Sequence, residues 1–346
     1  MRISFHARLL LTGMATVAIA TGCSGGASQA VSPMGPLAHQ QSASSSLERV
    51  VPMTLAHPLS SASTFSPGND TLGAAAVYVS DFLAGTVTVI STAGTQTAQV
   101  TGFNYPKGLT GDSLGNVYIV DQRASAVYRY SAGLKTLGLT IPVTGYYPTD
   151  VAVSTSGVVG VTSGTSTAGG AGAATFYAKN ATTPCATITD PNWTRMYFGS
   201  FDDSGALYVG GRDINANVIL GVIHGGCSAK KITTLTGASI GYIGGIQIAS
   251  NDNILIDDQT TSTVYSYKPP VNNVFAAPVA TTTLSGAGDA VFISLNRTST
   301  DIYDTDASFA YVQEFAYPSG GAAIKTFMAT GAQSVGGVYV SPNVQP

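Results

Sequence analysis

Charged residues are scarce in this sequence: Asp, Glu, Lys and Arg make up only 10% of its 346 residues, and the net charge is −3. So weak a field excludes electrostatic attraction to nucleic acid or to anionic lipid. The helix-filling residues Glu, Lys and Leu are also few, whereas 40 Gly, 17 Tyr and abundant Ser, Thr and Val are typical of strands and turns. Because 44% of the residues are hydrophobic, the chain as a whole is not disordered, and we expect an all-β fold.

The side chains of acid–base catalysis are nearly missing from most of the chain. After residue 72 there is one histidine, His224, and one glutamate, Glu314. A Ser-His-Asp or Cys-His triad would therefore depend on His224, which follows an apolar strand pattern and is interpreted as a turn residue. Glu314 falls inside another strand pattern and is interpreted as a solvated side chain. We therefore predict no catalytic residue.

The apolar run near the N-terminus is too short to span a bilayer. It covers residues 9–20 and follows Arg2 and Arg8, whereas a membrane-spanning helix needs about 20 apolar residues. A basic start followed by a short apolar core is typical of an export signal.

The apolar run ends in Ala-Thr-Gly-Cys at residues 20–23, which resembles the lipobox of bacterial lipoproteins, with Ala20 where the family usually has Leu. In that family the cysteine receives a lipid and becomes the mature N-terminus. The resemblance implies that residues 1–22 are a lipoprotein signal peptide. Cys23 would then attach the exported protein to the bacterial cell membrane or outer membrane, facing the periplasm or the exterior. The alternative is ordinary cleavage after the Ala-Ile-Ala sequence at residues 18–20.

A stretch without periodicity follows the export signal. Residues 24–68 are rich in Ser, Ala, Gly, Gln and Pro, and such a composition buries too little apolar surface to offset the entropy lost on ordering. We therefore interpret residues 23–71 as a flexible tether between the lipid and a folded domain. The alternative is a strand within residues 50–55 that docks on the domain.

A pair of residues, a small hydroxyl residue followed by a turn former, recurs six times after residue 72. The pairs are Thr101-Gly102, Thr144-Gly145, Thr189-Asp190, Thr236-Gly237, Ser285-Gly286 and Thr330-Gly331. Successive pairs are 43, 45, 47, 49 and 45 residues apart, and short strand patterns fill each interval. Four antiparallel strands per repeat of this length are the signature of propeller blades.

The two ends of the repeat region predict how the ring closes. The region begins at residues 77–81 with a second-strand pattern and finishes at residues 337–340 with a first-strand pattern. Three strands from the beginning and one from the end would complete a sixth blade and leave no open seam. We therefore predict that residues 72–346 form a six-bladed β-propeller with four antiparallel strands per blade.

Residues 106–121, PKGLTGDSLGNVYIVD, resemble the NHL repeat, whose pattern is Pro-x-Gly-Ile-Ala-Val-Asp followed by Gly-Asn-Ile-Tyr-Val-Ala-Asp. The chain is also similar to the wider six-bladed group with gluconolactonase-like, TolB-like and YWTD propellers. The resemblance covers about residues 76–342 and implies the fold. It implies little about function, because the same propeller hosts lactonases, lyases, receptors and protein-binding platforms.

The enzymes of this group need residues that the sequence does not supply in the expected places. Gluconolactonase-like propellers hold a divalent metal in the central channel with Glu, Asn and Asp, and streptogramin B lyases need a His and a Glu near the axis. Here no Glu or His falls in a first or second strand pattern, so we expect no catalytic metal. Aspartates that could bind Ca²⁺ remain as pairs, although Asp also caps turns; they are Asp202-Asp203, Asp257-Asp258 and Asp304/Asp306.

Two cysteines remain when Cys23 is set aside. Cys185 and Cys227 are an even pair in an exported chain, which favours a disulfide between adjacent repeats. The alternative is two free, buried thiols.

Aromatic and basic residues gather in the loops after the repeated pairs, which should meet on one face near the axis, and the loops between second and third strands, with Arg212, should reach the same face. We predict a binding face there, because exposed Trp, Tyr and Arg dominate binding energy; its residues are Tyr105, Lys107, Tyr147, Trp193, Arg195, Arg212 and Tyr242. The alternative is that the aromatics pack between blades. The sequence thus predicts a monomeric, membrane-tethered module that binds a protein or glycan of the cell envelope, with a metal-dependent lactonase- or lyase-like enzyme as the alternative.

Overall fold

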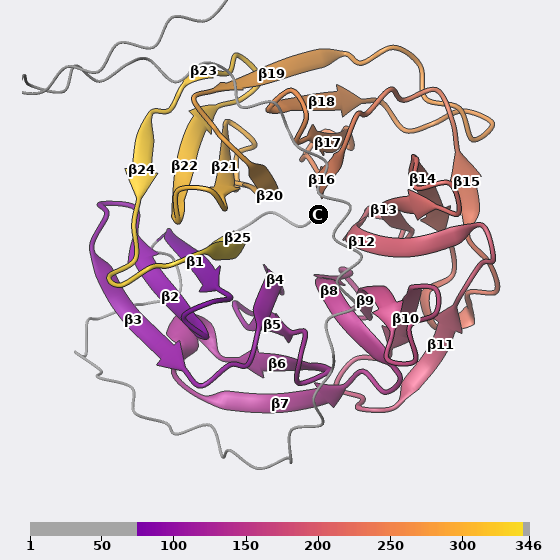
Figure 1. The fold of residues 1–346 in the computed structure, drawn as a ribbon, viewed down its shortest axis with the longest axis horizontal. Coiled ribbons are helices and arrows are strands. Elements are labelled where there is room, and N and C mark those ends of the chain that lie inside the picture. Colours follow the sequence, from indigo (N-terminus) through magenta and orange to yellow (C-terminus); the bar gives the residue numbers. More distant parts are fainter. Residues whose placement is uncertain (1–74, 342–346) are drawn as a thin grey trace, which may run out of the picture. The chain divides into compact units, whose positions relative to one another are not determined.

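The computed structural model describes residues 75–341. They form six antiparallel sheets around a central axis (Figure 1). The chain is a six-bladed β-propeller, which confirms the fold predicted from the repeats. The predicted signal peptide, Cys23 and the predicted tether lie outside the described residues. No helix in the described part of the chain is long and apolar enough to cross a membrane.

The first three blades take their strands in order from the axis outward. Blade 1 contains β25 (Val335–Ser341), β1 (Ala76–Asp81), β2 (Thr86–Ser91) and β3 (Gln96–Thr101). Blade 2 contains β4 (Pro106–Gly111), β5 (Val117–Asp121), β6 (Ala126–Tyr130) and β7 (Leu137–Pro142), with the 3-10 turn η1 (Ala132–Leu134) before β7. Blade 3 contains β8 (Tyr146–Val153), β9 (Val159–Ser166), β10 (Ala173–Tyr177) and β11 (Pro184–Ile188).

The last three blades follow the same order. Blade 4 contains β12 (Trp193–Phe201), β13 (Leu207–Asp213), β14 (Val218–Ile223) and β15 (Thr233–Leu235), with η2 (Gly226–Ser228) before β15. Blade 5 contains β16 (Ile243–Ile248), β17 (Ile254–Asp258), β18 (Thr263–Tyr267) and β19 (Ala280–Ser285). Blade 6 contains β20 (Ala290–Leu295), β21 (Asp301–Asp306), β22 (Tyr311–Ala316) and β24 (Lys325–Phe327). A short strand that the repeats did not predict, β23 (Gly321–Ala322), pairs in parallel with β19.

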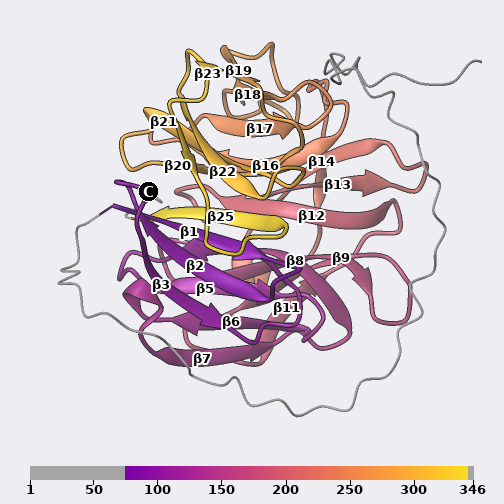
Figure 2. The ribbon, with the colours of Figure 1, turned by 60° about the vertical axis from the view of Figure 1, so that its left-hand side comes forward.

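The ring closes where the repeat pattern placed the closure. The C-terminal strand β25 pairs antiparallel with β1, with Val340 opposite Val77 and Tyr339 opposite Tyr78. Figure 2 shows β25, in yellow, lying beside the indigo strands of the N-terminal part of the blade. Hydrogen bonds between the two ends of the repeat region therefore hold the ring together and leave no open edge at the seam.

The glycines of the repeated pairs turn the chain from each outer strand back to the axis. Gly102, Gly145, Gly237, Gly286 and Gly331 all have positive φ, between 76° and 96°. Side chains with a Cβ rarely adopt this conformation, so glycine is the residue suited to these turns. The repeat that the sequence displays is therefore a repeat of backbone geometry.

One backbone hydrogen bond recurs in all six blades. The N–H of the residue that follows each second strand donates to the carbonyl of the residue that precedes the first strand of the same blade. The six bonds, between 2.9 and 3.2 Å long, are Phe82 to Ser334, Gln122 to Tyr105, Thr167 to Gly145, Ile214 to Asn192, Gln259 to Tyr242 and Ala307 to Asp289. They bring the loops after the second strands and the starts of the inner strands to one face of the propeller, called the entry face below.

In four blades an aspartate at the end of the second strand fastens the entry-face loops. The carboxylates of Asp81, Asp121, Asp258 and Asp306 each accept hydrogen bonds from two or more backbone amides of these loops. For Asp258 and Asp306 this supports the interpretation of the sequence pairs as turn caps.

A disulfide joins blades 3 and 4 at their outer edge. Cys185, in β11, is bonded to Cys227, in η2, with 5.0 Å between the Cα atoms. The short turn η2 brings Cys227 to the neighbouring blade, and the loop that the bond closes spans 42 residues of sequence.

Candidate functional site

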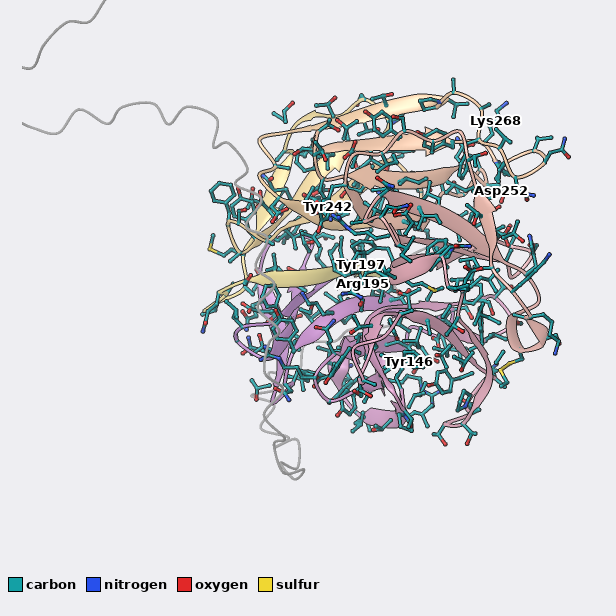
Figure 3. The ribbon with its side chains drawn as sticks, turned by 45° about the vertical axis from the view of Figure 1, so that its right-hand side comes forward. Tyr146, Arg195, Tyr197, Tyr242, Asp252 and Lys268 are labelled. Atoms are coloured by element: carbon teal, nitrogen blue, oxygen red, sulfur yellow. A yellow bond between two sulfur atoms is a disulfide. The ribbon has the colours of Figure 1, made fainter. Side chains whose placement is uncertain are left out.

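A cavity of about 390 Å³ opens on the entry face at the mouth of the central channel. Figure 3 shows three residues that line it, Arg195, Tyr197 and Tyr242, close together, whereas Asp252 and Lys268 lie far out on the propeller. Five blades contribute to this mouth cavity; its lining is Tyr105, Lys107, Gln122, Tyr147, Thr149, Gly164, Thr165, Arg195, Tyr197, Phe198, Tyr242, Ile243, Gln259, Val291 and Phe292.

Most of the residues predicted to form a binding face meet at this cavity. Five of the seven line it: Tyr105, Lys107, Tyr147, Arg195 and Tyr242. They come from four blades, since Tyr105 and Lys107 both belong to blade 2, and the inner strands bring them together because every first strand begins on the entry face. The sixth, Arg212, lies at the rim, where its guanidinium carbon is 4.3 Å from the centre of the Tyr242 ring.

The prediction for Trp193 is not supported by its position. Trp193 is the first residue of β12 rather than part of a loop, and its side chain is fully buried. It packs in a cluster that includes Phe176 of blade 3 and Met196 of blade 4. Trp193 therefore acts as an apolar wedge between two blades, which was the alternative interpretation of the aromatics, and it is not available to a partner.

Cations lie against aromatic rings around the mouth cavity. The Lys107 ammonium nitrogen is 4.3 Å from the centre of the Phe82 ring and 4.8 Å from that of Tyr105. The guanidinium carbon of Arg123 lies 4.4 Å from the Tyr105 ring centre. Each contact is a cation–π geometry, in which the face of the ring attracts the cation.

The environment of Lys107 makes its charge less stable than usual. Burial of the ammonium group, and to a smaller extent the nearby charge of Arg123, lowers the pKa of Lys107 to about 8. A lysine in this state is poised to gain from an anion, because an opposite charge would offset both causes of the shift.

Five polar residues of the lining, Thr165 among them, were not singled out in the sequence. Gln122 and Gln259 each directly follow a fastening aspartate, so their common place in the repeat was a signal that could have found them. Tyr197 follows Arg195 by two residues in β12, and both line the cavity, although the strand register shifts between Met196 and Phe198. Thr149 is buried and had no comparable signal.

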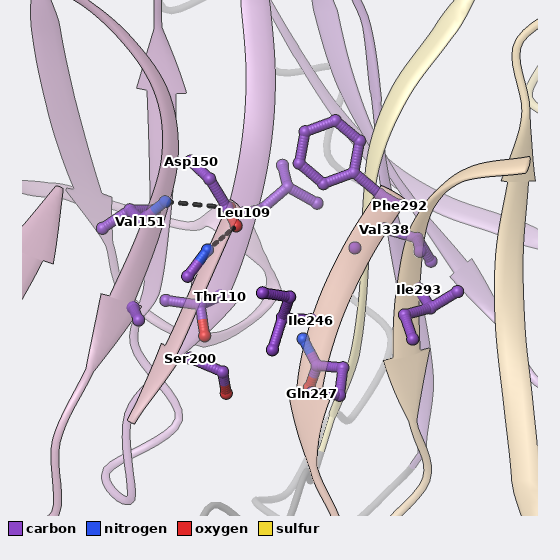
Figure 4. Close-up of a pocket in the computed structure, with 13 residues that line it drawn as sticks. Leu109, Thr110, Asp150, Val151, Ser200, Ile246, Gln247, Phe292, Ile293 and Val338 are labelled. Carbon is purple, nitrogen blue, oxygen red and sulfur yellow. Dashed lines mark hydrogen bonds between the residues drawn. The ribbon is translucent and has the colours of Figure 1, made fainter. Parts of the chain in front are cut away.

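Below the mouth cavity the channel becomes narrow. A space of about 10 Å³, enough for a water molecule, lies among the inner strands of all six blades. Figure 4 shows Thr110, Asp150, Ser200 and Gln247 among the side chains that line it. The channel is therefore filled by side chains along this stretch, and the mouth cavity is the larger space at the axis.

Asp150 is the one carboxylate among the residues that line the mouth cavity and the narrow channel. Its carboxylate accepts hydrogen bonds from the backbone N–H groups of Val151 (2.9 Å) and Gly199 (3.2 Å), and burial raises its pKa to about 7. A Cβ on Gly108 would lie 2.1 Å from the Asp150 carboxylate. The glycine of the Pro-x-Gly motif thus leaves the space that this side chain occupies.

The remaining candidates for catalysis lie away from the axis. His224 is exposed just beyond β14. Glu314 lies in the third strand of blade 6 and accepts a hydrogen bond of 2.7 Å from the Tyr303 hydroxyl. Among residues 75–341, no three side chains of the types His, Cys, Asp or Glu are grouped so that they could hold a metal ion.

Two aspartates between blades 5 and 6 differ from those that accept hydrogen bonds from the entry-face loops. Asp257 and Asp304 are fully buried, and none of their four carboxylate oxygens has a hydrogen-bond partner. Burial and neighbouring acidic groups raise the pKa of both side chains well above the usual range. Leu255 and Ile302, which precede them by two residues on the same strands, pack in one apolar cluster between these blades. The two acids therefore lie buried in an interface lined by apolar side chains.

Comparison with known proteins shows the propeller fold. The sequence matches no family model and no curated protein. Among solved structures, nidogen from a nidogen/laminin complex gives a TM-score of 0.59 at 15% identity, over 77% of this chain and 98% of that chain. A functionally unknown protein from Desulfotomaculum acetoxidans gives 0.52 at 11% identity, with the same coverage. A streptogramin B lyase gives 0.47 at 12% identity over 73% of each chain.

Proposed function

We propose that this protein is a binding propeller that takes a glycan of the cell envelope into the mouth cavity. The observation that supports it is the lining itself: four tyrosines from four different blades surround an open space of about 390 Å³. This volume is in the range of small-molecule sites. Aromatic rings offer flat apolar faces to sugar rings, while their hydroxyls can hydrogen-bond to sugar hydroxyls.

The test is saccharide binding by the purified protein, measured by isothermal titration calorimetry against a panel of oligosaccharides. We expect Tyr147→Ala and Tyr242→Ala to weaken the binding of a saccharide about tenfold or more, because each removes an aromatic anchor. Phe309→Ala is the matched control, since Phe309 is 55% exposed and does not line the cavity. The proposal is wrong if no saccharide binds the wild type, or if the two tyrosine variants bind as well as the control.

A protein partner is the second candidate, and a separate observation favours it. Leu83, Ile214 and Phe309 are 60%, 68% and 55% exposed at the tips of loops on the entry face. Exposed apolar groups that share one face are typical of protein-binding surfaces. The nidogen propeller of similar fold comes from a complex with laminin. Under this candidate, substitution of Ile214 and Phe309 by serine would abolish capture of an envelope protein that Tyr147→Ala still captures.

We further propose that the propeller works outside the cytoplasm, anchored by a lipid on Cys23. The lipobox-like end of the signal sequence supports this, and so does the disulfide between Cys185 and Cys227, because such bonds persist in oxidising compartments. We expect Cys23→Ala to release the protein from the membrane fraction into the soluble fraction. Unchanged partitioning into detergent would show that the anchor is wrong.

A further inference from the structure

Positive charge is concentrated at the mouth cavity. Lys107 and Arg195 line it, Arg123 and Arg212 lie on tyrosine rings of its wall, and no Asp or Glu is among its lining residues. These are four of only 15 Lys and Arg residues in a chain whose net charge is −3. Because the chain is otherwise poor in cations, the positive charge at the cavity is a local feature and does not reflect the composition of the whole chain.

The Lys107 ammonium group is held in place before any ligand arrives. The rings of Phe82 and Tyr105 flank it at 4.3 and 4.8 Å, so it loses little freedom when an anion binds. Arg195 is fixed by a hydrogen bond of 3.0 Å from its guanidinium to the Thr194 carbonyl. Preorganised cations of this kind favour a ligand that carries a fixed negative charge.

The rest of the lining suits an uncharged polyhydroxyl body. Tyr147, Tyr197 and Tyr242 provide aromatic faces, and the amides of Gln122 and Gln259 provide both donors and acceptors. We propose that the ligand of the mouth cavity is an acidic saccharide whose anionic group lies between Lys107 and Arg195. This inference rests on the proposed glycan-binding function and adds the charge of the ligand to it.

The pH dependence of binding follows from the groups around Lys107. Phe82, Tyr105 and Arg123 surround its ammonium group, and Tyr147, Arg195 and Tyr197 share the cavity with it. The lysine is charged below its pKa of about 8 and neutral above it. The affinity for an anionic saccharide should therefore be highest below pH 8 and decrease as the pH rises to 9 or 10, with Lys107→Arg removing the decrease because arginine stays charged.

The experiment compares sugars that differ in charge and little else. The full chain is titrated with trigalacturonate, with the neutral galactose trisaccharide, and with a sulfated heparin-derived tetrasaccharide. We expect an acidic probe to bind about tenfold more tightly or better than the neutral one, as for one hydrogen-bonded charge pair. The carboxylated and sulfated probes show which anionic group the cavity takes. Lys107→Met and Arg195→Gln should lose this preference, whereas Lys268→Met and Arg297→Gln, at exposed positions outside the cavity, should keep it.

Each result decides the matter. Equal affinity for neutral and acidic trisaccharides would overturn the acidic ligand and leave glycan binding intact. Absence of binding for every saccharide would overturn both proposals. A Lys107→Met variant that melts like the wild type and keeps the full charge preference would also overturn the inference. Recovery of the preference in Lys107→Arg supports a role in binding, because a merely structural loss would not be restored by charge alone.

Discussion

The mouth cavity and the interface between blades 5 and 6 are two departures from the repeat, and both concern charge. At the cavity, Lys107 and Arg195 line an open space that has no carboxylate among its lining residues. At the interface, Asp257 and Asp304 are buried among apolar side chains, and their carboxylate oxygens have no hydrogen-bond partner. The difference is access. A cation at an open cavity can be stabilised further by an anionic ligand, whereas a buried acid without a hydrogen-bond partner is stabilised by keeping its proton.

Aspartates along the same strands sharpen this contrast. Asp258 follows Asp257, and Asp306 follows Asp304 by two residues, yet both of these neighbours accept hydrogen bonds from loop amides. Asp258 and Asp306 therefore stabilise the fold through hydrogen bonds, whereas the acids one or two residues before them are buried without a partner and destabilise it. We expect the cavity to determine binding and the interface to affect stability.

The largest expected effect is a loss of stability when a side chain between the blades is removed, compared with one at the mouth cavity. Trp193→Ala should lower the free energy of unfolding by about 3–5 kcal/mol, because it leaves a cavity between blades 3 and 4. Tyr242→Ala, on the exposed rim at 42% exposure, should change it by about 1 kcal/mol or less. Urea denaturation of the two variants measures both values. A Trp193→Ala protein of normal stability would contradict the wedge between the blades.

The sequence predicted the fold well because five of the six repeated turns need glycine, so the repeat is visible in the sequence. Glycines such as Gly102 and Gly237 must adopt positive φ, so their spacing reports blade length directly. The sequence also placed together five residues that line the mouth cavity, since residues at the start of the inner strands meet at the axis. Trp193 was misplaced because it was assigned to a loop, whereas β12 begins at this residue and its side chain packs in the interface between blades 3 and 4.

The buried acids could not be predicted as a pair. Asp257 and Asp304 are 47 positions apart in the sequence, and each resembles the fastening aspartate beside it. Which of two nearby acids faces the amides and which faces the next blade depends on strand register. That register is visible only once the strands are paired, as for Asp258 opposite Ile243 and Asp257 opposite Val264.

The second prediction concerns Asp304 and its dependence on pH. Because the pKa of Asp304 is raised in the folded state, the unfolded chain releases the proton as the pH rises above about 4 while the native state keeps it, so stability decreases. Asp304→Asn removes this effect, since asparagine resembles the protonated acid. We expect the variant to melt at a higher temperature than the wild type at pH 7.5 and at a similar temperature near pH 4, with about 1.4 kcal/mol gained per unit of pKa shift.

Asp306→Asn is the matched control on the same strand. Its carboxylate accepts hydrogen bonds from the N–H groups of Gly288 and Ser308, so the change should destabilise the protein at pH 7.5. If Asp304→Asn also lowers the melting temperature at pH 7.5, the interpretation of Asp304 as an unpaired, protonated acid is wrong.

The smallest expected effect is that of Ca²⁺ on the melting temperature. It tests whether a cation, rather than a proton, neutralises Asp257 and Asp304. Ca²⁺ takes six to eight oxygen ligands, whereas Asp257 and Asp304, with the unpartnered amide oxygen of Gln313, are fewer groups than such a shell needs. A bound cation at 100 times its dissociation constant would add about 2.7 kcal/mol to the stability of the folded state, which a thermal melt resolves readily. We expect millimolar Ca²⁺ and excess EDTA to leave the melting temperature unchanged within error. A rise of several degrees with Ca²⁺ that Asp257→Asn abolishes would show instead that a cation, not a proton, neutralises the pair, and Asp304→Asn would then destabilise the protein.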